Sequence, residues 1–132
     1  MSETAIKKPR PKHLDLMVIR QPLPAFVSIL HRVSGAGLFI MLPVLLWLFG
    51  TSLGSPESAT AAVECVANPL VKLILFGLLW AYLHHFCAGI RFLFLDMHKG
   101  LDLATARMTS WIVLGVSLML TVLIGARLFL LG

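Results

Sequence analysis

Two adjacent histidines and an arginine interrupt one of the most apolar parts of this chain, the stretch LHHFCAGIRFLFLD at residues 83–96. A histidine within an apolar helix is commonly a haem ligand, a proton relay or a hydrogen-bonding packing residue. His84 and His85 cannot both ligate one iron, because neighbours on a helix point about 100° apart. Gly89 lies four residues after His85 on the same face, where a missing side chain leaves room for a flat macrocycle, whereas His84 has Ala88 there. The spacing favours His85 as a ligand and leaves His84 without an assigned role.

A second polar group lies in SILHRVSG at residues 28–35. At 100° per residue, Ser28, His31, Arg32 and Gly35 fall on one helix face within an arc of roughly 60°. Arginine offers a fork of donors for a carboxylate or carbonyl, and serine adds a donor without charge. This face could therefore hold a carboxylate or carbonyl ligand. Equally, Arg32 and His31 could reach the lipid headgroups while Ser28 caps its own helix, and periodicity does not decide between these interpretations.

The composition requires that these residues be positioned by membrane helices. The chain has 132 residues, of which 58% are hydrophobic and only 13% charged, unlike an ordinary soluble domain. A bilayer core about 30 Å thick needs roughly 20 apolar residues per helix, which leaves room for three spans and no separate soluble domain. We expect an all-α membrane protein forming a single membrane-anchor domain, 1–132. Its expected parts are a polar basic arm, 1–22, a transmembrane region, 23–132, with spans at about 28–50, 69–95 and 108–131, and a loop at 51–68.

The distribution of charge predicts the orientation of the spans. The net charge is +5, but the basic residues are not interleaved with aromatic ones as on a nucleic-acid surface, so no nucleic-acid partner is expected. Lysine and arginine are concentrated in the arm and around the second link, and the first loop has none, which places the N-terminus in the cytoplasm and the C-terminus in the periplasm. The basic residues before the first span are Lys7, Lys8, Arg10, Lys12 and Arg20. In the third span, Ser117, Thr121 and Gly125 recur every four residues and would let another helix approach closely.

Depth in the membrane connects the two polar groups. His85 lies about ten residues, roughly 15 Å, from the cytoplasmic end of the second span, and Arg91 lies about 9 Å nearer that end. Arg91 is therefore expected at the depth of the Ser28–Arg32 face. A haem held by His85 with its propionates toward the cytoplasm would meet cations from both helices. The third span contains no histidine, so a second axial ligand could come from another chain.

These residues together resemble the cytochrome b membrane-anchor subunit, or C chain, of bacterial succinate dehydrogenase. The resemblance extends over nearly the whole chain and is carried by RPKHLDL, IRQPLPAFVSILHRVSG, LLWLFGTSLGSPE and the H-x-x-x-G-I-R pattern within HFCAGIRFLFLD. SILHRVSG and the H-x-x-x-G-I-R pattern lie in separate spans. Together they are specific evidence for the family, although either motif alone would be weak evidence.

The resemblance implies a set of partners and a site. Such subunits pair with a second small three-helix anchor, the D chain, and together hold a flavoprotein and an iron-sulfur protein on the inner membrane. Haem b lies between the two anchors with one axial histidine from each, and the family pattern assigns His85 here. Ubiquinone binds near the iron-sulfur subunit, where Ser28 and Arg32 match the quinone contacts. His31 and Arg32 match the positions that contact the haem propionates, and Arg91 joins them by the depth argument above.

The implied function is electron transfer from succinate to quinone, in the tricarboxylic acid cycle and the respiratory chain. The chain would be a subunit of the enzyme complex and not an enzyme on its own. One departure is Phe92, where the family often has a second histidine. Two other classes remain open: a small transporter subunit, although transporters usually need more spans or paired repeats, and a structural anchor or assembly protein whose histidines only pack.

Overall fold

The computed structural model describes residues 18–129, which form four helices and no strand. The helices are α1 (Leu23–Ser52), α2 (Pro56–Ala67), α3 (Pro69–Asp96) and α4 (Leu103–Phe129). Three of them, α1, α3 and α4, are long and apolar enough to cross a bilayer, which confirms the predicted all-α fold with three spans. Most of the predicted basic arm, including Lys7, Lys8, Arg10 and Lys12, lies outside the described residues.

The first span begins five residues before its predicted start. Pro22 is the N-cap of α1 and Pro24 lies in its first turn. Prolines there remove no helical hydrogen bond, because the first N–H groups of a helix have no intrahelical partner. The two prolines therefore belong to the beginning of the helix and do not delay it.

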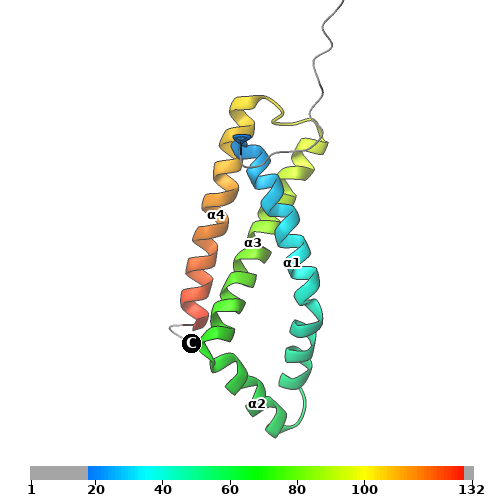
Figure 1. The fold of residues 1–132 in the computed structure, drawn as a ribbon, viewed down its shortest axis with the longest axis vertical. Coiled ribbons are helices and arrows are strands. Elements are labelled where there is room, and N and C mark those ends of the chain that lie inside the picture. Colours follow the sequence, from blue (N-terminus) through cyan, green and yellow to red (C-terminus); the bar gives the residue numbers. More distant parts are fainter. Residues whose placement is uncertain (1–17, 130–132) are drawn as a thin grey trace, which may run out of the picture.

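The segment predicted as a loop between the first two spans contains α2, so that prediction was wrong. Ser55 caps this helix by accepting a 3.3 Å hydrogen bond from the Ser58 N–H, and Glu57 lies in its positively polarised first turn. Asn68 ends α2 and caps α3, its Oδ1 accepting from the Leu70 N–H at 2.9 Å. Figure 1 shows α2 joining the ends of α1 and α3 that diverge from each other.

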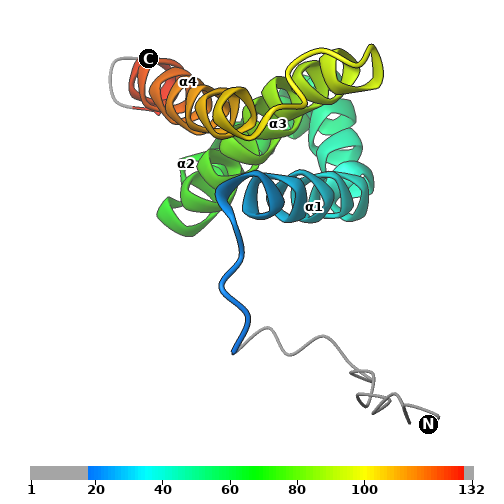
Figure 2. The same ribbon diagram turned by 90° about the horizontal axis from the view of Figure 1, so that it is seen from above.

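The helix α3 lies between α1 and α4, as the view along the bundle shows (Figure 2). One buried apolar cluster joins the three spanning helices, with Val27 from α1, Ala88 from α3 and Val113 from α4. On α4, Ser117 and Thr121 are almost fully buried, and each hydroxyl donates to a carbonyl of its own helix. A Cβ added to Gly125 would overlap the Phe76 ring of α3. The small-residue stripe predicted in the third span thus serves close packing within this chain.

A short link at residues 97–102 returns the chain from α3 to α4. His98 and Gly100 have positive φ values of 58° and 77°, which make the tight reversal possible. Asp102 precedes α4 and its Oδ2 accepts the Thr105 N–H at 2.9 Å. Hydrogen bonds from Thr105, chiefly from its backbone, hold the pKa of the Asp102 carboxyl below its usual value. The charged cap fixes the start of α4 beside the end of α3.

Candidate functional site

The two histidine motifs meet where α1 contacts α3. The rings of His31 and His85 stack with centroids 4.1 Å apart and planes 9° from parallel, and both residues are half-buried. The ring of Phe92 lies against His31 at 5.0 Å. The structure therefore brings together His31 from the first motif and His85 from the second, although 54 residues separate them in the sequence.

Glycines make this close approach possible. A Cβ added to Gly35 of α1 would lie 2.7 Å from Cε1 of His85, and one added to Gly89 of α3 would lie 3.7 Å from Nε2 of His31. Each helix thus presents a glycine to the histidine of the other. Helical spacing favoured Gly89 as the glycine that faces His85, but in the structure it is Gly35. The contacts of a glycine depend on how the two helices cross, which spacing along one helix does not show.

The imidazole of His85 is held by a hydrogen bond to the backbone of α1. Its Nδ1 lies 2.9 Å from the carbonyl oxygen of His31, which also accepts the hydroxyl of Ser34 at 2.9 Å. The Ser34 hydroxyl itself lies 3.3 Å from His85 Nδ1. A carbonyl can only accept, so the bond assigns the proton to Nδ1 and leaves the lone pair on Nε2. Metal-ligating histidines are commonly oriented in this way, by donating from the other ring nitrogen to a carbonyl.

His84 has a different environment from its neighbour. It is fully buried in the bundle, with its ring 5.3 Å from that of Trp80. Among the described residues, neither of its ring nitrogens has a hydrogen-bond partner. A ligand as large as a macrocycle could reach these nitrogens only by opening the packing around them.

The other two residues of the first motif lie toward the outside of this chain. Ser28 is half-buried and Arg32 is exposed, both on α1 within one turn of His31. Within residues 18–129, neither side chain has a hydrogen bond or an ion pair. Their donors are therefore available to a group from outside the chain.

The side chain of Arg91 points toward α4, which its depth in the membrane did not predict. It is only 6% exposed, and its Nε donates to the Thr109 hydroxyl of α4 at 3.0 Å, while Nη2 lies 3.4 Å from the Ala106 carbonyl. These bonds lead to α4 and not to α1. Residues at one depth can point to different neighbours around a helix, so depth alone did not reveal these bonds, and the expected place of Arg91 beside the Ser28–Arg32 face stays a prediction.

Two supporting features of the site were not identified as such from the sequence: the Ser34 hydroxyl and the backbone carbonyl of His31. Both act across the contact between α1 and α3. Gly35 was placed on the polar face, but its contact with His85 was not foreseen. No local pattern reveals these pairings, since a backbone carbonyl is present at every position.

Comparison with known proteins finds a family and several relatives. The family described as succinate dehydrogenase/fumarate reductase transmembrane subunit matches residues 6–124. The succinate dehydrogenase cytochrome b556 subunit of Paracoccus denitrificans is 34% identical over 114 residues, which are 86% of this chain and 88% of that protein. The subunit of the same name from Coxiella burnetii is 34% identical over 117 residues, 88% of this chain and 94% of that protein. That of Rickettsia prowazekii is 31% identical over 115 residues, 87% and 90% of the two chains.

Proposed function

This chain belongs to the succinate dehydrogenase/fumarate reductase transmembrane subunit family, and on that premise we propose that it ligates haem b through His85 and helps to form a quinone-reduction site. As a member of this family with three apolar helices, it is a multi-pass protein of the bacterial inner membrane and a membrane-anchor subunit of succinate dehydrogenase. The proposal concerns the cofactor, the quinone and the residues that hold them.

One observation carries the assignment of His85. Its Nδ1 is held 2.9 Å from the His31 carbonyl, which orients the ring and leaves Nε2 as the metal-ligating nitrogen. The residues present thus fit a haem iron. When bound, haem b supplies a one-electron carrier whose potential depends on its axial ligands and surroundings. His84 lacks such a bond and is enclosed by the bundle, which supports His85 over its neighbour.

The second axial ligand comes, under this proposal, from the second small anchor subunit. The two anchors together hold the iron-sulfur subunit and the flavoprotein, in which succinate is oxidised. This chain forms one membrane-anchor domain with its basic N-terminal arm in the cytoplasm and its C-terminus in the periplasm. The excess of lysine and arginine in the arm and around the second link supports this orientation.

Ser28 and Arg32 bind the quinone in this proposal. Their unpaired donors, one neutral and one charged, suit a carbonyl oxygen. Negative charge grows on that oxygen as electrons reach the quinone, and fixed donors stabilise such charge more than they stabilise the neutral carbonyl. Ubiquinone is the expected quinone from the family resemblance.

His31 and Arg32 also neutralise the haem propionates in this proposal. His31 lies within one turn of Arg32, and its ring packs on His85. Phe92 occupies the place of the family's frequent second histidine and gives His31 an apolar neighbour. The role of Arg91 at the propionates stays a prediction, since its hydrogen bonds run to α4.

Co-purification tests the proposal directly. The tagged chain is isolated in mild detergent, its partners are identified by mass spectrometry, and the same sample is reduced and its absorption spectrum recorded. We expect three further subunits and a reduced b-type haem band. An assembled complex without that band would instead support a structural anchor whose histidines only pack.

A further inference from the structure

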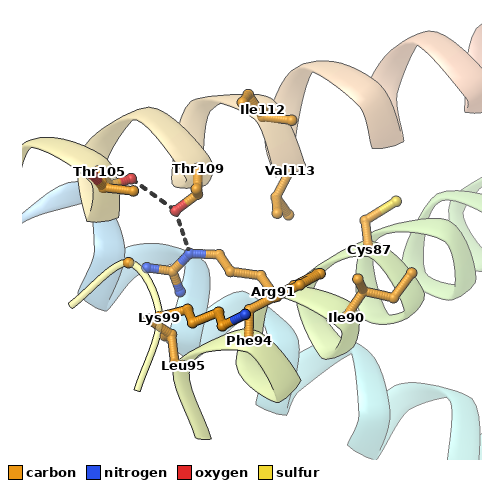
Figure 3. Close-up of a pocket in the computed structure, with 11 residues that line it drawn as sticks. Cys87, Ile90, Arg91, Phe94, Leu95, Lys99, Thr105, Thr109, Ile112 and Val113 are labelled. Carbon is orange, nitrogen blue, oxygen red and sulfur yellow. Dashed lines mark hydrogen bonds between the residues drawn. The ribbon is translucent and has the colours of Figure 1, made fainter. Parts of the chain in front are cut away.

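A second site lies between α3 and α4, beside the link that joins them. It is a cavity of about 340 Å³, shown in Figure 3. Arg91, Lys99 and Thr109 lie at its end nearest the link, and Ile90, Ile112 and Val113 form apolar walls leading away from that end. His31, His85, Ser28 and Arg32 do not line it, so it is distinct from the contact between the two histidines.

The polar end of the cavity carries positive charge without a counter-charge. Arg91 is 94% buried, and its two hydrogen bonds go to uncharged groups, a hydroxyl and a carbonyl. Among residues 18–129 it makes no ion pair, and the Asp102 carboxylate before α4 is engaged in capping that helix. Lys99 adds a second cation to the same cavity. A buried guanidinium is costly unless an anion balances it, so this end of the cavity suits an anionic group.

The apolar walls indicate what that anion is attached to. Arg91 lies five residues before the end of α3 at Asp96, about 7.5 Å inside the helix end, and Lys99 lies just beyond it. Ile90 and Ile112 are 41% and 52% exposed on helices long and apolar enough to cross the membrane, so the walls are open at the apolar surface of this chain. A phospholipid has this distribution, with its phosphate near the interface and its acyl chains deeper, and basic pockets between membrane helices bind anionic headgroups.

We infer that the α3–α4 cavity binds an anionic phospholipid, whose phosphate lies against Arg91 and Lys99 and whose acyl chain runs along Ile90 and Ile112. The lipid supplies the counter-charge that the described chain lacks at Arg91. It also fills the space between the two helices at the end where the short link and the hydrogen bonds of Arg91 join them. The inference does not depend on iron ligation by His85 or quinone binding by Ser28 and Arg32, since none of these residues lines the cavity, but it takes Arg91 as a phosphate contact in place of the predicted propionate contact.

Lipid retention by the purified complex tests this inference. The complex is stripped of lipid in neutral detergent and mixed with equal amounts of phosphatidylglycerol and phosphatidylcholine. Unbound lipid is then removed, and the retained lipid is extracted and quantified by mass spectrometry. We expect phosphatidylglycerol to be retained several times more than phosphatidylcholine. Removing one cation near the membrane surface, in Lys99→Gln, should lower its retention roughly fivefold.

Two kinds of variant distinguish the effect of the cations from the effect of the cavity volume on lipid retention. Ile112→Trp fills the cavity and leaves both cations in place, so it should also lower retention of phosphatidylglycerol. Arg107→Gln and Met108→Trp are matched controls, because both residues are exposed at the same end of α4 and do not line the cavity. Arg91→Gln removes a group that holds α3 to α4, so Lys99→Gln and Ile112→Trp carry the test without disturbing that bond.

Several results would overturn the inference. Equal retention of the two lipids would do so, as would wild-type retention in Lys99→Gln or Ile112→Trp, or an equal loss in the matched controls. Excess inorganic phosphate should leave the lipid bound, and its displacement by phosphate would reduce the cavity to a site for small anions. The haem spectrum of each sample should stay unchanged. A changed haem spectrum with unchanged lipid retention would instead support a contact between Arg91 and the haem propionates.

Discussion

Replacing Gly35 by alanine should loosen haem binding without adding or removing any polar group. The added Cβ would lie 2.7 Å from Cε1 and 3.1 Å from Nδ1 of His85. Carbon atoms in ordinary contact are about 3.5 Å apart, so the ring would have to move back by about 0.8 Å. Because Gly35 and the His31 carbonyl both belong to α1, this movement also lengthens the 2.9 Å bond from His85 Nδ1, by up to about 0.8 Å, and so weakens it.

The expected magnitude follows from the weakening of that bond. A single hydrogen bond contributes about 1 kcal/mol to stability, a loss the folded complex should tolerate. The effect on metal binding is larger, since losing the partner that orients a ligating histidine costs roughly 10- to 100-fold in affinity or activity. We therefore expect Gly35→Ala to assemble with its partners but to lose haem at least about tenfold more readily than the wild type.

The assay is the amount of reduced b-type haem per complex after repeated washing in detergent, with the midpoint potential measured on the haem that remains. Gly37→Ala is the matched control, because Gly37 lies on the same helix as Gly35 and a Cβ added there would have no atom within 4 Å. Gly89→Ala should also behave like the wild type, since its Cβ would be in ordinary contact with His31 at 3.7 Å. If Gly35→Ala keeps haem and potential equal to those of Gly37→Ala, the reasoning about the His31 carbonyl is refuted.

Other substitutions test the remaining parts of the structure. Arg32→Leu should lower quinone reduction more than electron transfer to a soluble dye, whereas Arg107→Leu, a matched exposed arginine, should lower neither; equal losses in Arg32→Leu would point to faulty assembly. Gly125→Ala should destabilise the packing of α3 on α4 by about 1–3 kcal/mol, because its Cβ would overlap the Phe76 ring, and heat denaturation of the complex in detergent measures this. Gly77→Ala, whose Cβ meets nothing within 4 Å, should be no less stable than the wild type, and equal melting of the two variants would contradict the packing argument.

Much of the fold could be predicted because a bilayer imposes a simple length and polarity on each helix. The exception was α2, which lies within the segment predicted as a loop at 51–68 and whose N-terminus is formed by Ser55 and Pro56. Serine and proline signal both the end of one helix and the beginning of another, so sequence pattern alone does not separate these cases. In the same way, Pro22 and Pro24 belong to the beginning of α1, which starts five residues before the predicted start of the first span.

The sequence could predict only those features of the candidate site that follow from residue spacing along a single helix. Helical spacing placed His31 on the polar face of the first span and favoured His85 in the second, and the structure brings the two rings together. Which atoms then meet depends on how α1 and α3 cross, so the contacts of Gly35 and the Ser34 hydroxyl could not be foreseen. Depth along a helix follows from residue number, but the direction of Arg91 toward α4 depends on where that helix packs.

The most direct test of the central claim is the absorption spectrum of the reduced complex carrying His85→Ala, measured at equal flavoprotein content beside the wild type and His84→Ala. We predict that the b-type haem band is absent from His85→Ala, while its partners still co-purify, and that the band is largely retained in His84→Ala. An unchanged band in His85→Ala, or its loss only in His84→Ala, would contradict the assignment of the haem ligand.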